Sequence, residues 1–254
     1  MFSLLADLIS FQLEAEELHA ARARALLDAE ETAKLRERFI GILGHDLRNP
    51  LNAITMAAQI LLTRDDVPEA SVGLVRRITR SATRIENMVS DLLDFARGRL
   101  GGFMPIDRKA CDAVAIVRQV TEELEMAYPG RQLELTTPPL LTVQWDRERV
   151  AQMLSNLIAN ALQHSPPASP VYVTLDGSTP LVALTVRNGG AAIPPETLRL
   201  IFDPFRQGAA THRPAGQGLG LGLYIAREIV MAHGGTIDVS TSDEGTTFTV
   251  RMPS

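Results

Sequence analysis

The sequence lacks several features that would assign it to a familiar class of protein. It holds a single cysteine, Cys111, so an intrachain disulfide is impossible and a reducing, cytoplasmic compartment is expected. No apolar run reaches the roughly 18–20 residues of a membrane-spanning helix. The N-terminus has no basic region followed by an apolar one, so it is not a signal peptide. We therefore expect any part that senses an external stimulus to lie outside this sequence.

The 254 residues have the composition of an ordinary globular protein. Hydrophobic residues make up 45% and charged residues 22%, which is too apolar for a disordered chain. The net charge of -5 argues against a general attraction to nucleic acid or anionic membranes. The length is sufficient for one large domain or two small ones.

Residues 1–38 contain neither glycine nor proline, which favours one long helix. Its first half has apolar residues at alternating spacings of four and three, the seam of a coiled coil: Leu4, Leu8, Phe11, Ala15 and Leu18. From Arg22 onward, charged residues interrupt this seam. We expect a coiled-coil signalling helix over 1–38, with a plain solvated helix as the alternative.

Two apolar series separated by a turn predict a helical hairpin over residues 39–98. Both series alternate spacings of three and four, and the stretch RDDVPEA, 64–70, supplies turn residues between them. One hairpin cannot cover both of its apolar stripes, so we expect two copies to pair into a four-helix bundle. Glycines near 97–102 end the second helix, and a linker is expected over 99–110.

From Cys111 onward the pattern becomes that of an α/β domain, over residues 111–254. Helices are expected over 112–126, 146–164 and 220–233, with a short one near 195–201. Six strands are expected, in the stretches RQLELTT, LLTVQWD, VYVTLDG, LVALTVRN, TIDVSTS and TTFTVRM.

The stretch FIGILGHDLRNPLNAI, residues 39–54, sets a histidine beside an aspartate. His45 lies about 200° around the helix from the leucines two residues away, which places it on the outer face of the bundle. If Asp46 accepts from one imidazole nitrogen, the other keeps a lone pair that can attack an electrophile. Asn49 lies on the same helix face. Taken alone, these residues also describe a solvated surface pair.

Two further stretches carry groups that suit a cation or a phosphate, although a solvated helix face and a flexible loop also describe them. Asn156 and Asn160 lie one turn apart on the polar face of a helix, where asparagine is a mediocre helix former. Amide oxygens suit a hard cation such as Mg²⁺. In GQGLGLGL, 216–223, alternate glycines lead into a helix, so the backbone can approach a ligand and free N–H groups can face phosphate. A Walker loop does not fit because GK[ST] is absent.

These stretches resemble the motifs of sensor histidine kinases. HDLRNPL resembles the phosphoacceptor box, NLIANA the N box, IFDPF the phenylalanine box and GQGLGL the second glycine box. The resemblance runs from about residue 35 to the C-terminus. It implies a homodimeric helical hairpin followed by an α/β sandwich ATP-binding domain with a mixed sheet. The implied function is an ATP- and Mg²⁺-dependent protein histidine kinase that passes its phosphoryl group to an aspartate of a response regulator.

The resemblance also implies roles for individual residues. His45 accepts the phosphoryl group, and Asp46 orients His45 and acts as the general base. Asn49 positions a water for dephosphorylation of the partner's aspartate. Asn160 ligates Mg²⁺. The nucleotide is held by Asn156, Asn160, Asn188, Gly190, Arg206, Gly216, Gly218, Leu219, Gly220 and Thr247, with Thr246 as an alternative to Thr247.

The first glycine box departs from the family pattern. The family has D-x-G-x-G-I-P, whereas this chain reads NGGAAIP over 188–194, so Asn188 replaces the aspartate. The lost charge-assisted bond could cost about 1–3 kcal/mol of nucleotide affinity. Gln163 stands where many relatives have a phosphate-binding lysine. This leaves open a dimeric docking module or a phosphatase that binds nucleotide weakly. A related ATPase without a histidine substrate would leave the hairpin unexplained.

The stretch LLADLISFQLEAEEL slightly resembles the exit helix of soluble sensor domains, including those of bacterial phytochromes.

Overall fold

The computed structural model describes residues 47, 49–64, 68–99, 104–206 and 219–254. The predictions for the helix over 1–38, for His45 and Asp46, and for Gly216 and Gly218 therefore lie outside the described residues. None of the helices in the described ranges is both long enough and apolar enough to cross a membrane.

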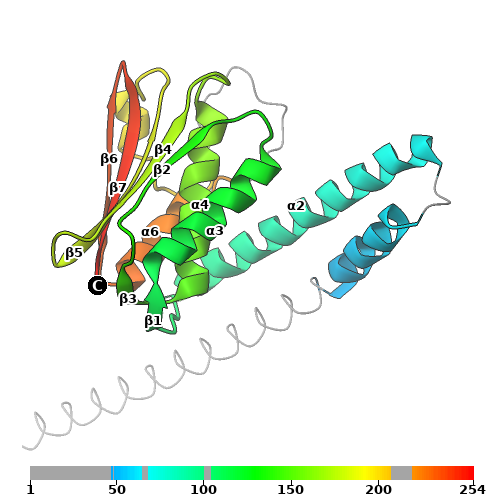
Figure 1. Ribbon diagram of the computed structural model, residues 1–254, viewed down its shortest axis with the longest axis horizontal. Helices are drawn as coiled ribbons and strands as arrows, with labels where there is room; N and C mark the ends of the chain where they lie inside the picture. Colours follow the sequence, from blue (N-terminus) through cyan, green and yellow to red (C-terminus); the bar gives the residue numbers. More distant parts are fainter. Residues whose placement is uncertain (1–46, 48, 65–67, 100–103, 207–218) are drawn as a thin grey trace, which may run out of the picture.

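The predicted helical hairpin is confirmed. Residues 49–62 form a helix that lies beside the long helix α2 (Glu69–Arg99), and a short connection joins the two (Figure 1). Leu51 and Ala58 on the first helix and Val75 and Ala82 on α2 are each less than 9% exposed. These residues fix the register of the two helices because each lies one heptad from the next on its own helix.

The C-terminal part is an α/β lobe with two sheets. A small sheet pairs β1 (Lys109–Asp112) antiparallel with β3 (Thr142–Trp145). The main sheet has the order β2 (Leu133–Thr136), β4 (Val171–Asp176), β5 (Leu181–Asn188), β7 (Gly245–Pro253), β6 (Thr236–Ser242). Because β2 and β4 are parallel and the remaining pairs antiparallel, the predicted mixed sheet is confirmed.

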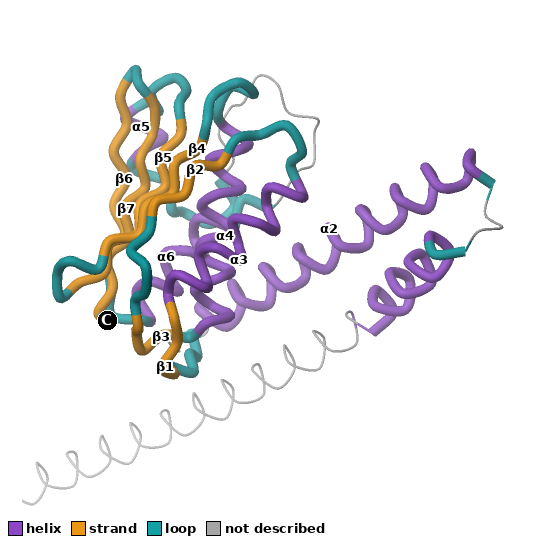
Figure 2. Tube along the Cα trace, viewed as in Figure 1, coloured by secondary structure: helices purple, strands orange, loops and turns teal. Residues whose placement is uncertain are grey.

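Three helices cover one face of the main sheet and separate it from the hairpin (Figure 2). They are α3 (Ala113–Ala127), α4 (Arg147–His164) and α6 (Gly222–Ala232). The predicted short helix is α5 (Pro195–Leu198). Asp112 and Asp146 cap α3 and α4, since their carboxylates accept from the N–H groups of Val114 and Arg149 at 2.9 and 3.1 Å.

The core of the lobe lies between these helices and the sheet. Along β5 and β7, alternate residues face the helices and are buried, including Val186, Phe248 and Val250. The lobe begins earlier in the chain than Cys111, the predicted start, because Met104 is already buried in this core and β1 starts at Lys109. A four-residue strand such as β1 gives too short an alternation to be recognised in the sequence.

Candidate functional site

The polar face of α4 lies open while its apolar face is fully covered. The stripe predicted from the sequence is buried without exception: Val150, Leu154, Leu157, Ile158 and Ala161. Asn156 and Asn160 are partly exposed on the other side. The side-chain amide of Asn156 donates to the carbonyl of Gly222 at 3.1 Å, so it ties α4 to the first turn of α6.

The N-terminus of α6 is arranged to receive an anion. Its N-cap residue is Leu221, and no side chain caps the first turn. The positive end of the helix dipole at this terminus favours a negatively charged ligand. Because Asn156 holds this end of α6 against α4, an anion here would lie next to the two asparagines.

Phe205 and Arg206 precede residues 207–218 in the chain, and Leu219 and Gly220 follow them; we call these four residues the lid root. The N–H of Phe205 donates to the carbonyl of Gly220 at 3.0 Å. Gly220 has φ of 72°, and a Cβ there would lie 2.6 Å from the carbonyl oxygen of Arg206. Only glycine suits this position. The arrangement brings the predicted residues Arg206, Leu219 and Gly220 together.

A second group of predicted residues gathers around the end of β5. Asn188 is 4% exposed and faces the helices. Gly190 has φ of 141°, and a Cβ there would lie 3.1 Å from the carbonyl oxygen of His164 at the end of α4. A Cβ at Gly245 would collide with the Asn188 carbonyl at 2.0 Å. These glycines let three backbone segments converge around the Asn188 side chain.

The structure selects between the two threonines of β7. Thr246 is opposite Asn188 in the strand pairing, is 5% exposed, and lies 3.1 Å from the hydroxyl of Thr241. That Thr241 hydroxyl in turn accepts from the N–H of Ile193 at 3.0 Å. Thr247 is opposite Arg187 and points to the outer face of the sheet. Thr246 therefore replaces Thr247 among the candidate pocket residues, because successive strand residues alternate sides.

The two phenylalanines of the IFDPF stretch have different partners. The Phe202 ring lies edge-on to Phe248 of the sheet core, with centroids 6.4 Å apart. Phe205 instead contacts Phe95 of α2, with centroids 4.9 Å apart, and is the one non-glycine residue of the described ranges with positive φ, at 61°. Phe202 thus anchors the lid root in the lobe, whereas Phe205 connects it to the hairpin.

A buried histidine contacts the N-terminal end of α4. His233 is 1% exposed, and its Nε2 accepts from the N–H of Asp146 at 3.0 Å while its Nδ1 lies 2.8 Å from the Ile229 carbonyl. These contacts require the neutral tautomer with the proton on Nδ1. Burial lowers the pKa of His233, and the nearby Arg108 adds to this effect. The histidine therefore has a structural role at the N-cap of α4.

The candidate residues fit a nucleotide with a bound cation. Over the described ranges, no group of three or more histidine, cysteine or carboxylate side chains could hold a metal ion. A cation here would need the Asn160 amide oxygen together with oxygens of the ligand, which is how Mg²⁺ is commonly held beside phosphates. The side chain of Gln163 donates to the Tyr128 hydroxyl at 3.5 Å and adds no positive charge. Asn49 is exposed on the hairpin.

Comparisons with known protein families match both parts of the chain. Residues 35–101 match the family model of the His Kinase A (phospho-acceptor) domain. Residues 145–254 match the model of the histidine kinase-, DNA gyrase B- and HSP90-like ATPases.

Individual relatives cover most of this chain. A bacteriophytochrome of Pseudomonas aeruginosa is 38% identical over 225 residues, which are 89% of this chain but only 30% of that longer protein. The sensor protein VanSC of Enterococcus gallinarum is 32% identical over 249 residues, which cover 94% of this chain and 67% of the relative.

Two solved structures are similar to this chain over most of its length, across both the hairpin and the lobe. Full-length ShkA in complex with AMPPNP matches with a TM-score of 0.67 and 26% identity, over 85% of this chain and 45% of that one. The histidine kinase ThkA in complex with the response regulator protein TrrA matches with a TM-score of 0.55 and 25% identity, over 89% of this chain and 64% of that one.

Proposed function

The chain belongs to the sensor histidine kinases, and on that premise we propose that it phosphorylates its own His45 with ATP and transfers the phosphoryl group to an aspartate of a response regulator. In the first step a nitrogen of His45 attacks the γ-phosphorus, the bond to the β-phosphate oxygen breaks, and ADP leaves. Asp46 orients the imidazole and takes up its proton.

The observation that carries this proposal is the convergence of the nucleotide residues on one side of the lobe. Asn156 is bonded to the start of α6, the lid root joins Phe205 to Gly220, and Asn188 is buried opposite Thr246. The adenine would lie at the Asn188 end and the phosphates at the uncapped N-terminus of α6. ShkA, a structural neighbour, was solved with the ATP analogue AMPPNP, which supports ATP as the ligand.

Mg²⁺ is the proposed cation, with Asn160 as its protein ligand. When bound, the ion would neutralise phosphate charge, and the protein contributes position and electrostatic stabilisation rather than covalent chemistry. Arg206 at the lid root would add a positive charge near the phosphates. The use of ATP together with a single cysteine favours the cytoplasm as the place of action.

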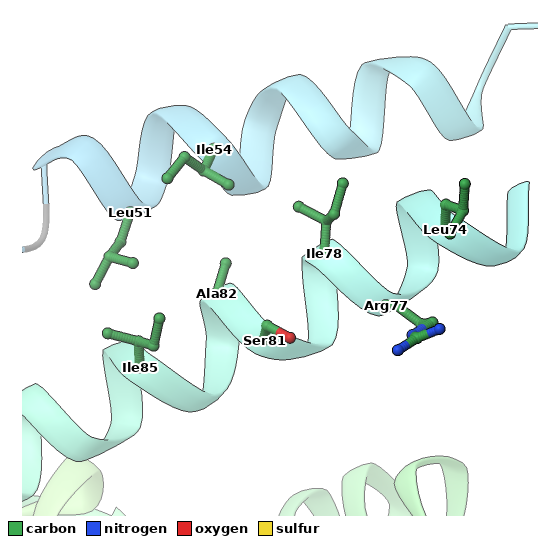
Figure 3. A pocket seen from close by; sticks show the side chains of 8 residues that line it. All are labelled: Leu51, Ile54, Leu74, Arg77, Ile78, Ser81, Ala82 and Ile85. Carbon is green, nitrogen blue, oxygen red and sulfur yellow. The ribbon is translucent and has the colours of Figure 1, made fainter. Parts of the chain in front are cut away.

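A homodimer is proposed from the exposed side of the hairpin. Each helix has three apolar residues spaced by seven that are between 43% and 50% exposed: Leu47, Ile54 and Leu61 on one helix, and Ile78, Ile85 and Leu92 on the other. The groove between the helices, about 470 Å³, is lined by members of this set (Figure 3). A second copy would cover the heptad stripe and complete a four-helix bundle.

The response regulator is the proposed partner. ThkA, a structural neighbour, was solved in complex with the response regulator protein TrrA. In this chain the regulator would bind the hairpin near His45, and the exposed Asn49 would orient a water for the reverse hydrolysis of the regulator's phosphoaspartate.

The test is labelling with ATP carrying ³²P at the γ-phosphate in the presence of Mg²⁺. We expect label that is stable to base and labile to acid, as a phosphoramidate is, and that disappears in His45→Gln. The matched control, His19→Gln, should retain full labelling. Absence of label in the parent chain at millimolar nucleotide, or label that persists in His45→Gln, would refute the proposal.

A further inference from the structure

The main sheet has a second face, which points away from α3, α4 and α6 (Figure 2). A pocket of about 390 Å³ lies on it, and its floor consists of two directly opposed strand pairs, Tyr172 with Arg187 and Thr174 with Thr185. These residues alternate along β4 and β5 with buried ones, so their side chains stand on the outer face. We call this the outer pocket, and its volume lies in the range of small-molecule sites.

Among the described residues that line the outer pocket, two are charged. Nη2 of Arg187 lies 3.5 Å from Oε2 of Glu244, which belongs to the turn between β6 and β7. Their side chains are 52% and 84% exposed, so solvent screens this ion pair and it contributes little to stability. Each of the two groups can therefore exchange the other for a ligand at small cost.

These two charges define the kind of ligand that fits. A simple anion would be attracted by Arg187 and repelled by Glu244, and a simple cation would meet the reverse. A molecule with a carboxylate and an ammonium on the same carbon satisfies both side chains, with a charge-assisted hydrogen bond to each. The Tyr172 ring, which is 40% exposed, adds an apolar surface for the rest of the molecule. This charge complementarity is that of a free α-amino acid.

The outer pocket shares two backbone segments with the predicted nucleotide site on the other face of the sheet. Gly189 lines the pocket, and its carbonyl accepts from the side-chain amide of Asn188 at 2.9 Å. Glu244 directly precedes Gly245, which lies so close to Asn188 that a Cβ there would collide with the Asn188 carbonyl. A ligand held between Arg187 and Glu244 would therefore tie together the segments that surround Asn188.

We propose that the outer pocket binds a free α-amino acid, with its carboxylate on Arg187, its ammonium on Glu244 and its side chain against the Tyr172 ring, and that the bound amino acid strengthens nucleotide binding. The second part rests on the proposed function, because it requires a nucleotide beside Asn188. A ligand that bridges the end of β5 and the turn before β7 holds Asn188 in place before the nucleotide arrives, and such preorganisation lowers the cost of binding. By linkage, the nucleotide strengthens amino-acid binding by the same factor.

The first test measures amino-acid binding to the full chain by calorimetry, without nucleotide. The probe is L-phenylalanine, whose ring suits Tyr172, at up to about 10 mM, where even a millimolar dissociation constant gives clear saturation. Phenylacetate and 2-phenylethylamine are the matched controls, because each lacks one of the two charges. We expect L-phenylalanine to bind and both controls to bind at least about tenfold more weakly. Absence of L-phenylalanine binding, or a control that binds as tightly, would overturn the site.

Variants locate the bound amino acid. Arg187→Gln and Glu244→Gln each remove one charge and should weaken L-phenylalanine binding at least about tenfold. Arg251→Gln is the matched control, because Arg251 stands on the same outer face, in a 3.0 Å ion pair with Asp238, and does not line the pocket. The fluorescence of Trp145, the only tryptophan, verifies that every variant is folded. Full affinity in either charge variant, or an equal loss in the control, would overturn the assignment.

The second test follows the nucleotide site. The affinity for a fluorescent ATP analogue with Mg²⁺ is measured with and without saturating L-phenylalanine. We expect the amino acid to tighten nucleotide binding about fivefold, and Arg187→Gln to abolish this effect. Unchanged or weakened nucleotide binding would overturn the coupling. If the chain binds no nucleotide under either condition, the proposed function fails, while the calorimetry still decides whether the outer pocket binds an amino acid.

Discussion

In the lobe, the large apolar side chains of α4 and the main sheet are fully buried by other parts of the same lobe, whereas in the hairpin every seventh apolar residue remains about half exposed. The lobe has a sheet covered by three helices, so each apolar stripe finds a partner. Two helices alone have no third surface to cover them. We therefore expect the lobe to be stable by itself, whereas the proposed second copy would cover the exposed stripe of the hairpin.

The largest expected effect is on the lobe core. Phe248→Ala removes a ring that is 1% exposed in the sheet core, so we expect a loss of about 3–5 kcal/mol in the free energy of unfolding of the lobe. Denaturant titration followed by Trp145 fluorescence measures this loss. Ile78→Ala in the hairpin should leave the same transition unchanged. An equal shift in both variants would mean that the lobe depends on the hairpin for its stability.

A charge on the exposed stripe should separate the dimer while the lobe stays folded. Ile85→Asp would force an unpaired carboxylate into the proposed helix bundle, so we expect the dissociation constant to rise about 100-fold or more. Light scattering across a concentration series gives this constant. Met56→Asp is the control, because Met56 is 63% exposed but lies off the stripe. A dimer that survives Ile85→Asp would place the interface elsewhere.

Nucleotide affinity should depend on the lobe alone. Asn188→Asp restores a charged acceptor at the buried end of β5, so we expect binding of a fluorescent ATP analogue to tighten about tenfold. Asn52→Asp, an exposed change on the hairpin, adds the same charge without effect on binding. Equal affinity for parent and Asn188→Asp would argue that the adenine does not lie at Asn188.

The two adjacent threonines offer a smaller and sharper test. Thr246→Val keeps the shape of a buried side chain but removes its hydroxyl, so we expect nucleotide affinity to fall about threefold to tenfold. Thr247→Val makes the same chemical change on the outer face of the sheet and should leave affinity unchanged. The same titration measures both variants, and a larger effect at Thr247 would contradict the assignment.

The smallest effect concerns pH. Because burial holds the pKa of His233 below its usual value of about 6.5, the unfolded chain binds its proton more readily than the folded one. The stability from neutral His233 is complete above that value and is lost as the pH falls through the lower pKa of the folded state. Denaturant titrations followed by Trp145 fluorescence give the free energy of unfolding at each pH between 7.5 and 5.5. We expect this free energy to decline as the pH falls, both in the parent and in the control His164→Gln. If the free energy of unfolding of His233→Gln depends on pH as steeply as that of the parent, His233 is not the source of this pH dependence.

Sequence patterns were sufficient to predict the elements whose apolar residues recur at regular spacings. The stripe on α4 and the heptad series of the hairpin predicted helices and their buried faces, and the glycine and asparagine motifs predicted a nucleotide lobe. The choice of Thr246 over Thr247 was not accessible, because both residues are consistent with a strand until its partner strand fixes which side faces the helices.

The ion pair between Asp94 of α2 and Arg149 of α4, at 3.0 Å, was equally inaccessible from the sequence. Asp94 and Arg149 are 55 residues apart, and in the sequence each is an ordinary charged residue of an amphipathic helix. Likewise, the IFDPF motif does not specify that the Phe205 ring contacts Phe95 of the hairpin.

The sequence by itself determined the order of the two parts, the periodicity of their helices and the chemical groups available to hold a nucleotide, because these follow from the spacing and type of neighbouring residues. Only the tertiary structure decided which distant groups meet: the pairing of β5 with β7, the contact of Gly220 with Arg206, and the burial of Asp94 against Arg149. Such contacts depend on how whole elements are placed relative to each other, and no local pattern records that placement.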